Sequence, residues 1–253
     1  MVLDNFRLGG KVAIVTGCST GLGQGMCLGL AEAGAEIVGV DYVPAPETAS
    51  QVQKLGRSFL GIEADLQTLG PIDSIVTSAV ERFGHIDILV NNAGIIRRQD
   101  AIDFSERDWD EVMNLNTKAL FFMSQAVARR FIKQGQGGKI INIASLLSFQ
   151  GGVRVPSYTT SKSGVMGLTR LLANEWAKYS INVNAIAPGY MATNNTAPLR
   201  NDAVRSAEIL GRIPAERWGE PGDLKGPVVF LASPAAQYVT GYTIAVDGGW
   251  LAR

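Results

Sequence analysis

The stretch Thr16-Gly17-Cys18-Ser19-Thr20-Gly21-Leu22-Gly23 decides the fold, because it joins a short apolar run, 11–16, to a helix-like segment, 22–33. Glycines allow a tight turn and let backbone N–H groups approach a pyrophosphate at the start of a helix. The spacing is GxxxGxG, which on its own is a weak signal. A strand, a glycine-rich turn and a helix in this order predict a dinucleotide-binding unit.

Working outward from this turn, short apolar runs alternate with helix-like segments along the chain. The predicted strands are 11–16, 36–40, 58–63, 86–90, 139–143, 182–187 and 242–246. The predicted helices are 22–33, 45–55, 72–83, 106–133, 157–178 and 222–232. Most of the predicted strands lack polar alternation, which is typical of strands buried on both faces. We therefore expect an α/β fold: a single-domain, Rossmann-type doubly wound parallel sheet of about seven strands, with helices on both faces.

No repeat, low-complexity tract or linker divides the chain, so residues 1–253 are expected to form one dinucleotide-binding catalytic domain. One region, 190–218, breaks the alternation of strands and helices. Its only helical part is predicted around 203–210. A long excursion inside a compact domain is usually functional, so we interpret this region as a substrate lid.

Composition excludes several classes of protein. Basic and acidic residues number 23 each, so no polyanion partner such as a nucleic acid is expected. No apolar run reaches the roughly 18 to 20 residues that span a bilayer, and residues 1–8 lack a signal-peptide pattern. Cys18, Cys27 and His85 fit no zinc pattern, so no metal is expected. These features predict a soluble, cytoplasmic protein in which His85 is a solvated or capping residue.

Acid–base chemistry is suggested by three residues, Ser145, Tyr158 and Lys162. Tyr158 and Lys162 are four residues apart in a predicted helix, so they share one face. An ammonium beside a phenol favours the phenolate, which would make Tyr158 a general base. Ser145, thirteen residues upstream of Tyr158, could hold a substrate oxygen beside it.

Asp41 suggests which nicotinamide cofactor is used. It lies twenty residues after Gly21, at the end of the second predicted strand. An acid there accepts hydrogen bonds from the ribose hydroxyls and repels a 2′-phosphate. Its neighbours Cys18, Ser19 and Tyr42 offer no cation for such a phosphate. The sequence therefore predicts NAD as the cofactor.

Taken together, these segments resemble the short-chain dehydrogenase/reductase family over about residues 9–249. The resemblance is carried by TGCSTGLG at 16–23, Asp65-Leu66, NNAG at 91–94, Asn116, Ser145, YTTSK at 158–162, PGYMAT at 188–193 and VDGGW at 246–250. It implies a Rossmann-type oxidoreductase and a homotetramer that packs the helices 106–133 and 157–178 and the C-terminal segment.

The resemblance also implies roles for individual positions. The catalytic set would be Asn116, Ser145, Tyr158 and Lys162, with Asn116 holding a water of a proton relay next to the lysine. The cofactor would be bound by Gly17, Ser19, Gly21, Leu22, Gly23, Asp41, Asp65, Leu66, Asn92, Ala93, Gly94, Tyr158, Lys162, Pro188, Gly189 and Thr193. In this set Lys162 would also contact the nicotinamide ribose.

Within the family, the segments 94–98, 145–158 and 189–196 resemble the sugar-acid dehydrogenases that act on 2-deoxy-D-gluconate at C3 or on 2-dehydro-3-deoxy-D-gluconate at C5. The expected substrate-binding residues are Ser145, Gln150, Arg154, Tyr158 and Asn194. A sugar acid needs a cation for its carboxylate, which Arg97, Arg98 or Arg154 could supply, and Arg154 is our first choice.

Two other functions stay open at this point. Related enzymes reduce 3-oxoacyl thioesters, but that activity would predict an NADPH-adapted second strand, against which Asp41 argues. A catalytically silent dinucleotide sensor is the alternative outside the enzymes. The presence of all four residues of the predicted catalytic set argues against it.

Overall fold

The computed structural model describes residues 1–253 and contains one sheet of seven parallel strands in the order β3-β2-β1-β4-β5-β6-β7. The strands are β1 (Val12–Thr16), β2 (Glu36–Asp41), β3 (Phe59–Glu63), β4 (Ile88–Asn91), β5 (Gly138–Ile143), β6 (Ile181–Pro188) and β7 (Thr243–Val246). The direction of winding reverses between β1 and β4, which opens a crevice at the carboxyl ends of the strands. The predicted fold class and number of strands are confirmed.

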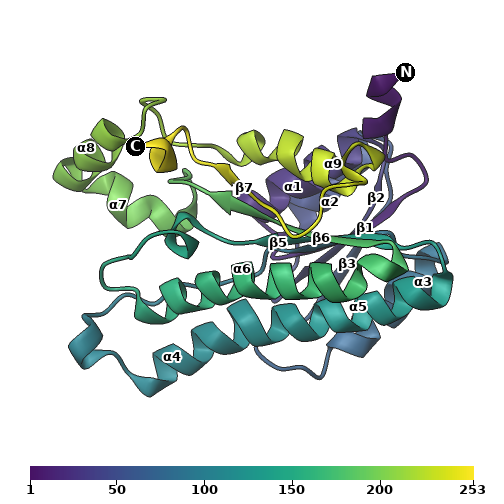
Figure 1. Cartoon of the computed structure of the whole chain (residues 1–253), viewed down its shortest axis with the longest axis horizontal. Helices are drawn as coiled ribbons and strands as arrows, with labels where there is room; N and C mark the ends of the chain where they lie inside the picture. Colours follow the sequence, from purple (N-terminus) through teal and green to yellow (C-terminus); the bar gives the residue numbers. More distant parts are fainter.

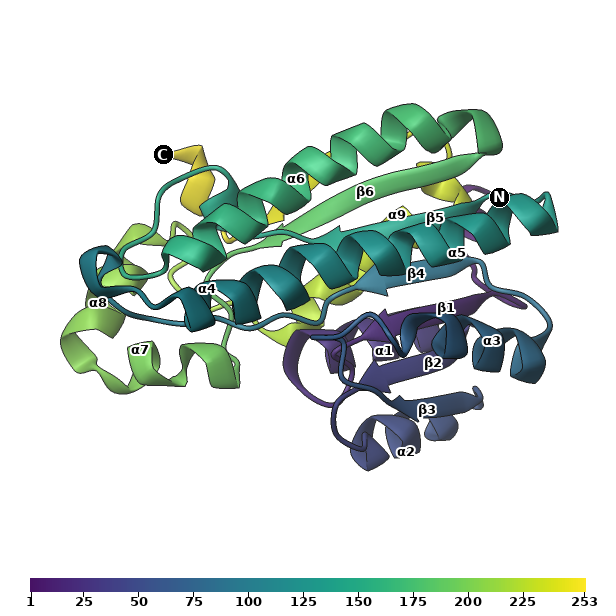
Figure 2. The same ribbon diagram turned by 90° about the horizontal axis from the view of Figure 1, so that it is seen from below.

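Helices cover both faces of the sheet (Figures 1 and 2). One layer contains α1 (Gly21–Glu32), α2 (Pro46–Lys54) and α9 (Lys225–Ala232). The other layer contains α3 (Ile72–Phe83), α4 (Glu106–Met113), α5 (Leu120–Gln134) and α6 (Pro156–Trp176). None of these helices has both the length and the apolar character needed to cross a membrane.

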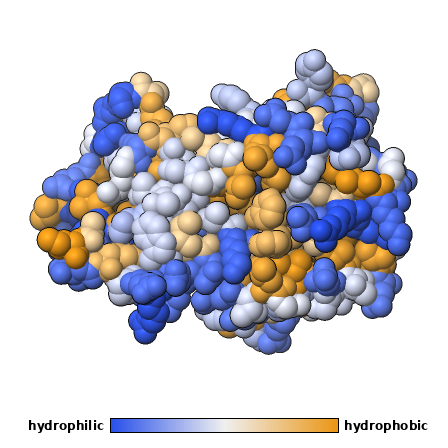
Figure 3. Space-filling view, turned by 60° about the horizontal axis from the view of Figure 1, so that its bottom comes forward, coloured by the Kyte–Doolittle hydropathy of each residue, from blue (hydrophilic) through white to orange (hydrophobic).

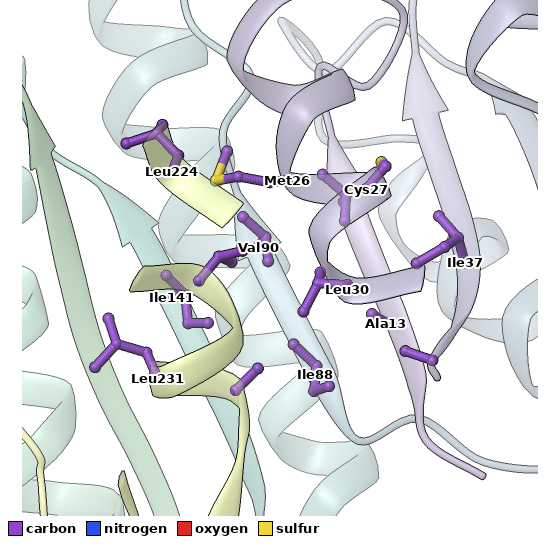
Figure 4. Close-up of a cluster of buried hydrophobic side chains, with 14 of the residues drawn as sticks. Ala13, Met26, Cys27, Leu30, Ile37, Ile88, Val90, Ile141, Leu224 and Leu231 are labelled. Carbon is purple, nitrogen blue, oxygen red and sulfur yellow. The ribbon is translucent and has the colours of Figure 1, made fainter. Parts of the chain in front are cut away.

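Two hydrophobic cores, one on each face, explain why the strands read as continuous apolar runs. Successive strand residues point to opposite faces, so both sets must be apolar. Ala13 of β1 packs with Leu30 of α1 and Leu231 of α9 in the first core (Figure 4). Ile14, the next residue of β1, belongs to the second core with residues of α3, α5 and α6. Cys18 and Cys27 are free thiols buried in the first core.

The predicted helix 106–133 is wrong in one respect. It is interrupted by a π-helical turn, η3 (Asn114–Ala119), which separates α4 from α5. The interruption has a tertiary cause, because the Asn116 side chain bonds both backbone groups of Ile95. Neither propensity nor periodicity reports such a contact.

The segment 190–218 lies beyond the carboxyl end of the sheet (Figure 1). It contains the 3-10 turn η6 (Asn194–Thr196) and two helices, α7 (Ala197–Asn201) and α8 (Ala203–Arg212). α8 covers the predicted helical centre, whereas α7 was not predicted. The Asp202 side chain caps α8 by accepting a hydrogen bond from Arg205 N, 3.0 Å away.

Candidate active site

The glycine-rich turn between β1 and α1 is shaped to hold a phosphate group. A Cβ atom on Gly23 would lie only 1.9 Å from the carbonyl oxygen of Gly17, so only glycine fits there. Thr20 is the N-cap residue of α1, but its side chain makes no capping hydrogen bond. The first N–H groups of α1 are therefore available to an anion, and the turn fits the pyrophosphate of a dinucleotide.

Side-chain hydrogen bonds of Asn92 and Thr16 stabilise this turn. Asn92 Nδ2 donates to the carbonyl oxygens of Thr16 and Gly17, both at 2.9 Å. Thr16 Oγ1 accepts from the backbone N–H groups of Asn92 and Ala93, both at 3.0 Å. These hydrogen bonds connect the carboxyl ends of β1 and β4. Ala93 and Gly94 follow β4, and Gly94 lies near Lys162 of α6.

Asp41 lies at the end of β2, beside the turn. Its carboxylate accepts hydrogen bonds from the backbone N–H groups of Ser19, at 2.9 Å, and Tyr42, at 2.8 Å. Burial and the charge of Asp41 together raise the pKa of the neighbouring Cys18 thiol to about 12. The Cys18 thiol therefore stays protonated, and the Asp41 carboxylate is bonded to backbone N–H groups and forms no salt bridge.

The structure brings Ser145, Tyr158 and Lys162 together at the carboxyl end of β5 and the start of α6. Lys162 Nζ lies 5.7 Å from the centroid of the Tyr158 ring and donates to Ile143 O at 2.6 Å. Ser145 Oγ accepts from Leu147 N, and Ser145 is 9% exposed. Burial lowers the pKa of Lys162 to about 8.

The pKa of Tyr158 differs from the sequence-based expectation. Burial raises the pKa of the phenol above its ordinary value, and this effect outweighs the two that lower it, hydrogen bonding with Ser145 and the positive charge of Arg98. Lys162 is not among the groups that lower it. The expected phenolate is thus not favoured by the protein alone, because desolvation penalises its charge more than Ser145 and Arg98 stabilise it.

Asn116 lies in the π-helical turn η3 and is 1% exposed. Its Oδ1 accepts from Ile95 N at 2.9 Å, and its Nδ2 donates to Ile95 O at 3.0 Å and Ser161 Oγ at 3.2 Å. A Cβ on Gly94 would lie 3.1 Å from Asn116 Oδ1 and 3.7 Å from Lys162 Nζ. Asn116 and Lys162 therefore meet at Gly94, as expected for members of one site.

The remaining predicted cofactor residues differ in their surroundings. Thr193, in the segment 190–218, has its methyl group 3.6 Å from where a Cβ on Gly21 would lie. Gly189 follows β6 and donates its N–H to Val246 O at 2.9 Å. Asp65 is exposed after β3 and accepts from Gln67 N, whereas Leu66 is buried in the second core.

The three arginines considered for the substrate carboxylate differ in their partners. Arg97 binds Glu111 through Nε and Nη2, at 3.0 and 2.8 Å. Arg154, our first choice, is paired with Asp100 at 2.9 Å. Only Arg98 has no carboxylate partner, and its charge reaches Tyr158. Arg98 is therefore the one of the three whose guanidinium is not already paired with a carboxylate, whereas the sequence analysis preferred Arg154.

Ser148 is a supporting residue that the sequence analysis missed. Its Oγ accepts from Ser145 N at 3.3 Å and donates to Lys162 O at 2.6 Å, so it links the segment of the serine to the helix of the lysine. The signal was present as a serine three residues after Ser145, the spacing of a capping box.

Comparison with known proteins agrees with this geometry. A family model described as short chain dehydrogenase matches residues 11–204. The chain belongs to the short-chain dehydrogenase family. A protein of Escherichia coli named 2-dehydro-3-deoxy-D-gluconate 5-dehydrogenase is 71% identical over 253 residues, covering 100% of both chains. A protein of the same name from Bacillus subtilis is 53% identical over 99% of this chain and 98% of its own.

Among solved structures, a gluconate 5-dehydrogenase of Burkholderia cenocepacia in complex with NADP and tartrate has a TM-score of 0.95. It is 39% identical and covers 100% of both chains. Membership of the family makes this chain an oxidoreductase that uses a nicotinamide cofactor. The predicted family and enzyme class are thereby confirmed.

Proposed function

We propose that this protein interconverts a secondary hydroxyl and a ketone at C5 of 2-dehydro-3-deoxy-D-gluconate, with NAD as the cofactor. The observation that carries the proposal is the full-length match to the Escherichia coli relative of that name, at 71% identity, on a chain that gathers Ser145, Tyr158 and Lys162 at one site.

In the proposed mechanism, Tyr158 takes the proton of the substrate hydroxyl during oxidation. A bound oxidised nicotinamide would accept the hydride from carbon and, being positively charged, would lower the pKa of the nearby phenol. Ser145 donates to the substrate oxygen and orients it toward Tyr158. Lys162 would hold the cofactor ribose and pass the proton onward through a water held beside it by Asn116. In reduction the same residues act in reverse.

Arg98 is proposed to hold the substrate carboxylate. Its guanidinium already lowers the pKa of Tyr158, so it lies within electrostatic reach of the reacting oxygen. Its Nη2 also donates to Asn195 O at 3.0 Å, which connects it to the segment we interpret as the lid. A planar guanidinium suits bidentate binding of a carboxylate. Asn194, exposed beside Asn195, and Gln150 are proposed to meet substrate oxygens.

The preference for NAD rests on Asp41. Its negative charge would repel a 2′-phosphate, and no cation stands beside it. The Burkholderia cenocepacia relative was crystallised with NADP, so the proposal is tested by comparing NAD and NADP directly on this protein.

The test is an assay of NAD reduction by the purified protein, with 2-dehydro-3-deoxy-D-gluconate, 2-deoxy-D-gluconate and D-gluconate compared side by side. We expect the highest kcat/KM for 2-dehydro-3-deoxy-D-gluconate. A higher value for 2-deoxy-D-gluconate would replace C5 oxidation by C3 oxidation. Oxidation of NADH or NADPH by a 3-oxoacyl thioester, with no turnover of the sugar acids, would establish the reductase alternative, and no turnover of any of these compounds would favour a sensor.

The matched variant for this assay is Tyr158→Phe, which keeps the ring and removes the hydroxyl. Loss of a general acid–base group lowers turnover by about 10²- to 10⁴-fold. Tyr179→Phe, an exposed tyrosine three residues beyond the end of α6, is the control and should leave turnover unchanged. Near-native turnover of Tyr158→Phe would refute the mechanism.

A further inference from the structure

The segment Val246-Asp247-Gly248-Gly249-Trp250 has no part in the mechanism above, yet it directs a tryptophan against the lid. Asp247 Oδ1 accepts from Gly249 N and its Oδ2 from Leu251 N, both at 2.9 Å. Gly249 has a φ of +90°, and a Cβ there would lie 3.0 Å from Pro214 Cγ. This turn places Trp250, which is 4% exposed, between the lid and the end of the sheet.

Trp250 is packed mainly against residues of the lid. It forms a small buried cluster with Ile209, Ile213 and Leu146. The Arg212 guanidinium lies 4.1 Å from the centroid of a Trp250 ring, in cation–π geometry, and the Tyr190 ring lies 4.7 Å from it. Of these neighbours only Leu146 lies outside the lid, and Leu146 directly follows Ser145.

The indole N–H of Trp250 contacts Gln150, in the loop that follows Ser145. Trp250 Nε1 donates to Gln150 Oε1 at 3.1 Å, and Arg212 Nη2 donates to the same oxygen at 3.3 Å. Gln150 is five residues after Ser145. The loop then returns to the catalytic helix, where a Cβ on Gly152 would lie 3.0 Å from the Thr159 hydroxyl, next to Tyr158.

Two donors on one oxygen define how the Gln150 amide lies. The amide is planar, so fixing Oε1 in place also fixes the direction of the Nε2 group. No protein acceptor engages Nε2, which is therefore free to donate to a ligand. Without these two donors the Gln150 amide can rotate by half a turn and direct its oxygen, instead of Nε2, toward the ligand. An amide oxygen repels a carboxylate.

We propose that Trp250 is a positioning residue for substrate binding: it fixes the Gln150 amide so that Nε2 donates to an oxygen of the bound sugar acid. Because Arg212 of α8 donates to the same Gln150 oxygen, the orientation of the amide also depends on the position of α8. The hydrogen bond from Arg212 to Gln150 thus couples the lid to substrate binding. The inference rests on the proposed function, because it assigns a donor to the same substrate site.

Trp250→Phe tests the role of the indole N–H. The variant keeps an aromatic ring between Tyr190 and Arg212 but cannot donate to Gln150. Because one hydrogen bond contributes modestly, we expect KM for 2-dehydro-3-deoxy-D-gluconate to rise about three- to tenfold, with KM for NAD unchanged. Trp176→Phe is the matched control, since Trp176 packs in the second core away from the site, and it should change neither KM.

A double-variant cycle separates positioning from general packing. Gln150→Glu keeps an acceptor for Trp250 and Arg212 but removes the donor and adds a negative charge, so it should raise KM for the sugar acid at least as much as Gln150→Ala does. If Trp250 acts through Gln150, adding Trp250→Phe to Gln150→Ala should raise KM no further. An equal effect of Trp250→Phe in both backgrounds, or a parallel rise in KM for NAD, would overturn the inference.

The same measurements keep this inference distinct from the proposed function. An active wild-type enzyme whose KM is unchanged by Trp250→Phe contradicts the role of Trp250 and leaves the proposed activity standing. A wild-type protein that neither turns over nor binds a sugar acid contradicts both.

Discussion

Lys162 is a charged side chain in the interior, and its protonation is coupled to folding. It is 4% exposed, and the one hydrogen bond of its Nζ goes to Ile143 O. Burial lowers its pKa from 10.5 to about 8, so the folded protein holds this proton less tightly than the unfolded chain does. Between pH 8 and 10.5 the unfolded chain binds more protons, and the contribution of Lys162 to stability therefore rises with pH.

This coupling predicts how Lys162→Met affects stability at different pH values. The free energy of unfolding of the variant minus that of the wild type should fall by about 3 kcal/mol as pH rises from 7.5 to 10.5. Urea unfolding at several pH values measures it, and groups common to both proteins cancel. Lys178→Met, at an exposed position, should give a difference independent of pH. A flat difference for Lys162→Met would show that Lys162 titrates as a solvated group.

Asp41 gives a second prediction for a single residue. Asp41→Asn keeps one of the two oxygens that accept from Ser19 and Tyr42 and removes the negative charge that would face a 2′-phosphate. The ratio of kcat/KM for NAD to that for NADP should therefore exceed one in the wild type and fall about tenfold in the variant, or ~1.4 kcal/mol. Glu175→Gln on α6 removes the same charge far from the site and should leave the ratio unchanged. A wild type that prefers NADP would refute the assignment of NAD.

The sequence predicted which residues gather at the site better than how each is used. Glycine spacing and an acid at a strand end are local patterns, so the turn at 16–23 and Asp41 were found where expected. The choice among Arg97, Arg98 and Arg154 depends on partners distant in sequence, Glu111 and Asp100, that no local pattern reveals. The raised pKa of Tyr158 could not be anticipated for a similar reason, since burial is a property of the folded protein.

Among the elements, η3 shows how a tertiary contact changes a helix. The predicted helix 106–133 was continuous because Asn114 to Ala119 contains no proline or glycine. In the structure the Asn116 side chain donates to Ile95 O and accepts from Ile95 N. These two hydrogen bonds take the place of those that a neighbouring strand would make with the segment after β4. The π-helical turn directs the Asn116 side chain toward Ile95. Such turns are frequent at functional sites.

Asn116→Ala should therefore destabilise the protein as well as reduce activity. It leaves the N–H and C=O groups of Ile95 without partners, which costs about 2 to 4 kcal/mol of unfolding free energy. Urea denaturation measures the loss. Asn114→Ala, in the same turn but without a side-chain hydrogen bond, should be neutral within about 0.5 kcal/mol. Equal effects of the two substitutions would show that Asn116 has no special structural role.

At the scale of the whole molecule, β7 is less covered than the strands inside the sheet. β1, β4 and β6 are buried along their full lengths, whereas every residue of β7 is at least partly exposed. Tyr242, just before β7, is 63% exposed, and Leu171 on α6 is 47% exposed. Figure 3, turned toward the layer of α4, α5 and α6, shows apolar patches between polar ones. Uncovered strand edges and apolar helix faces of this kind are usually protected by association.

We therefore propose a homotetramer in which these surfaces are buried between copies of the chain. Sedimentation velocity at micromolar concentration should show a single species of about four times the 27.0 kDa chain mass. Ala245→Asp puts a charge on the exposed residue of β7 and should shift the protein to smaller species, because an unpaired charge is costly in an interface. Val204→Asp, on the exposed face of α8, is the matched control and should leave the mass unchanged. A wild-type monomer would refute the assembly, and unchanged mass of Ala245→Asp would remove β7 from its interfaces.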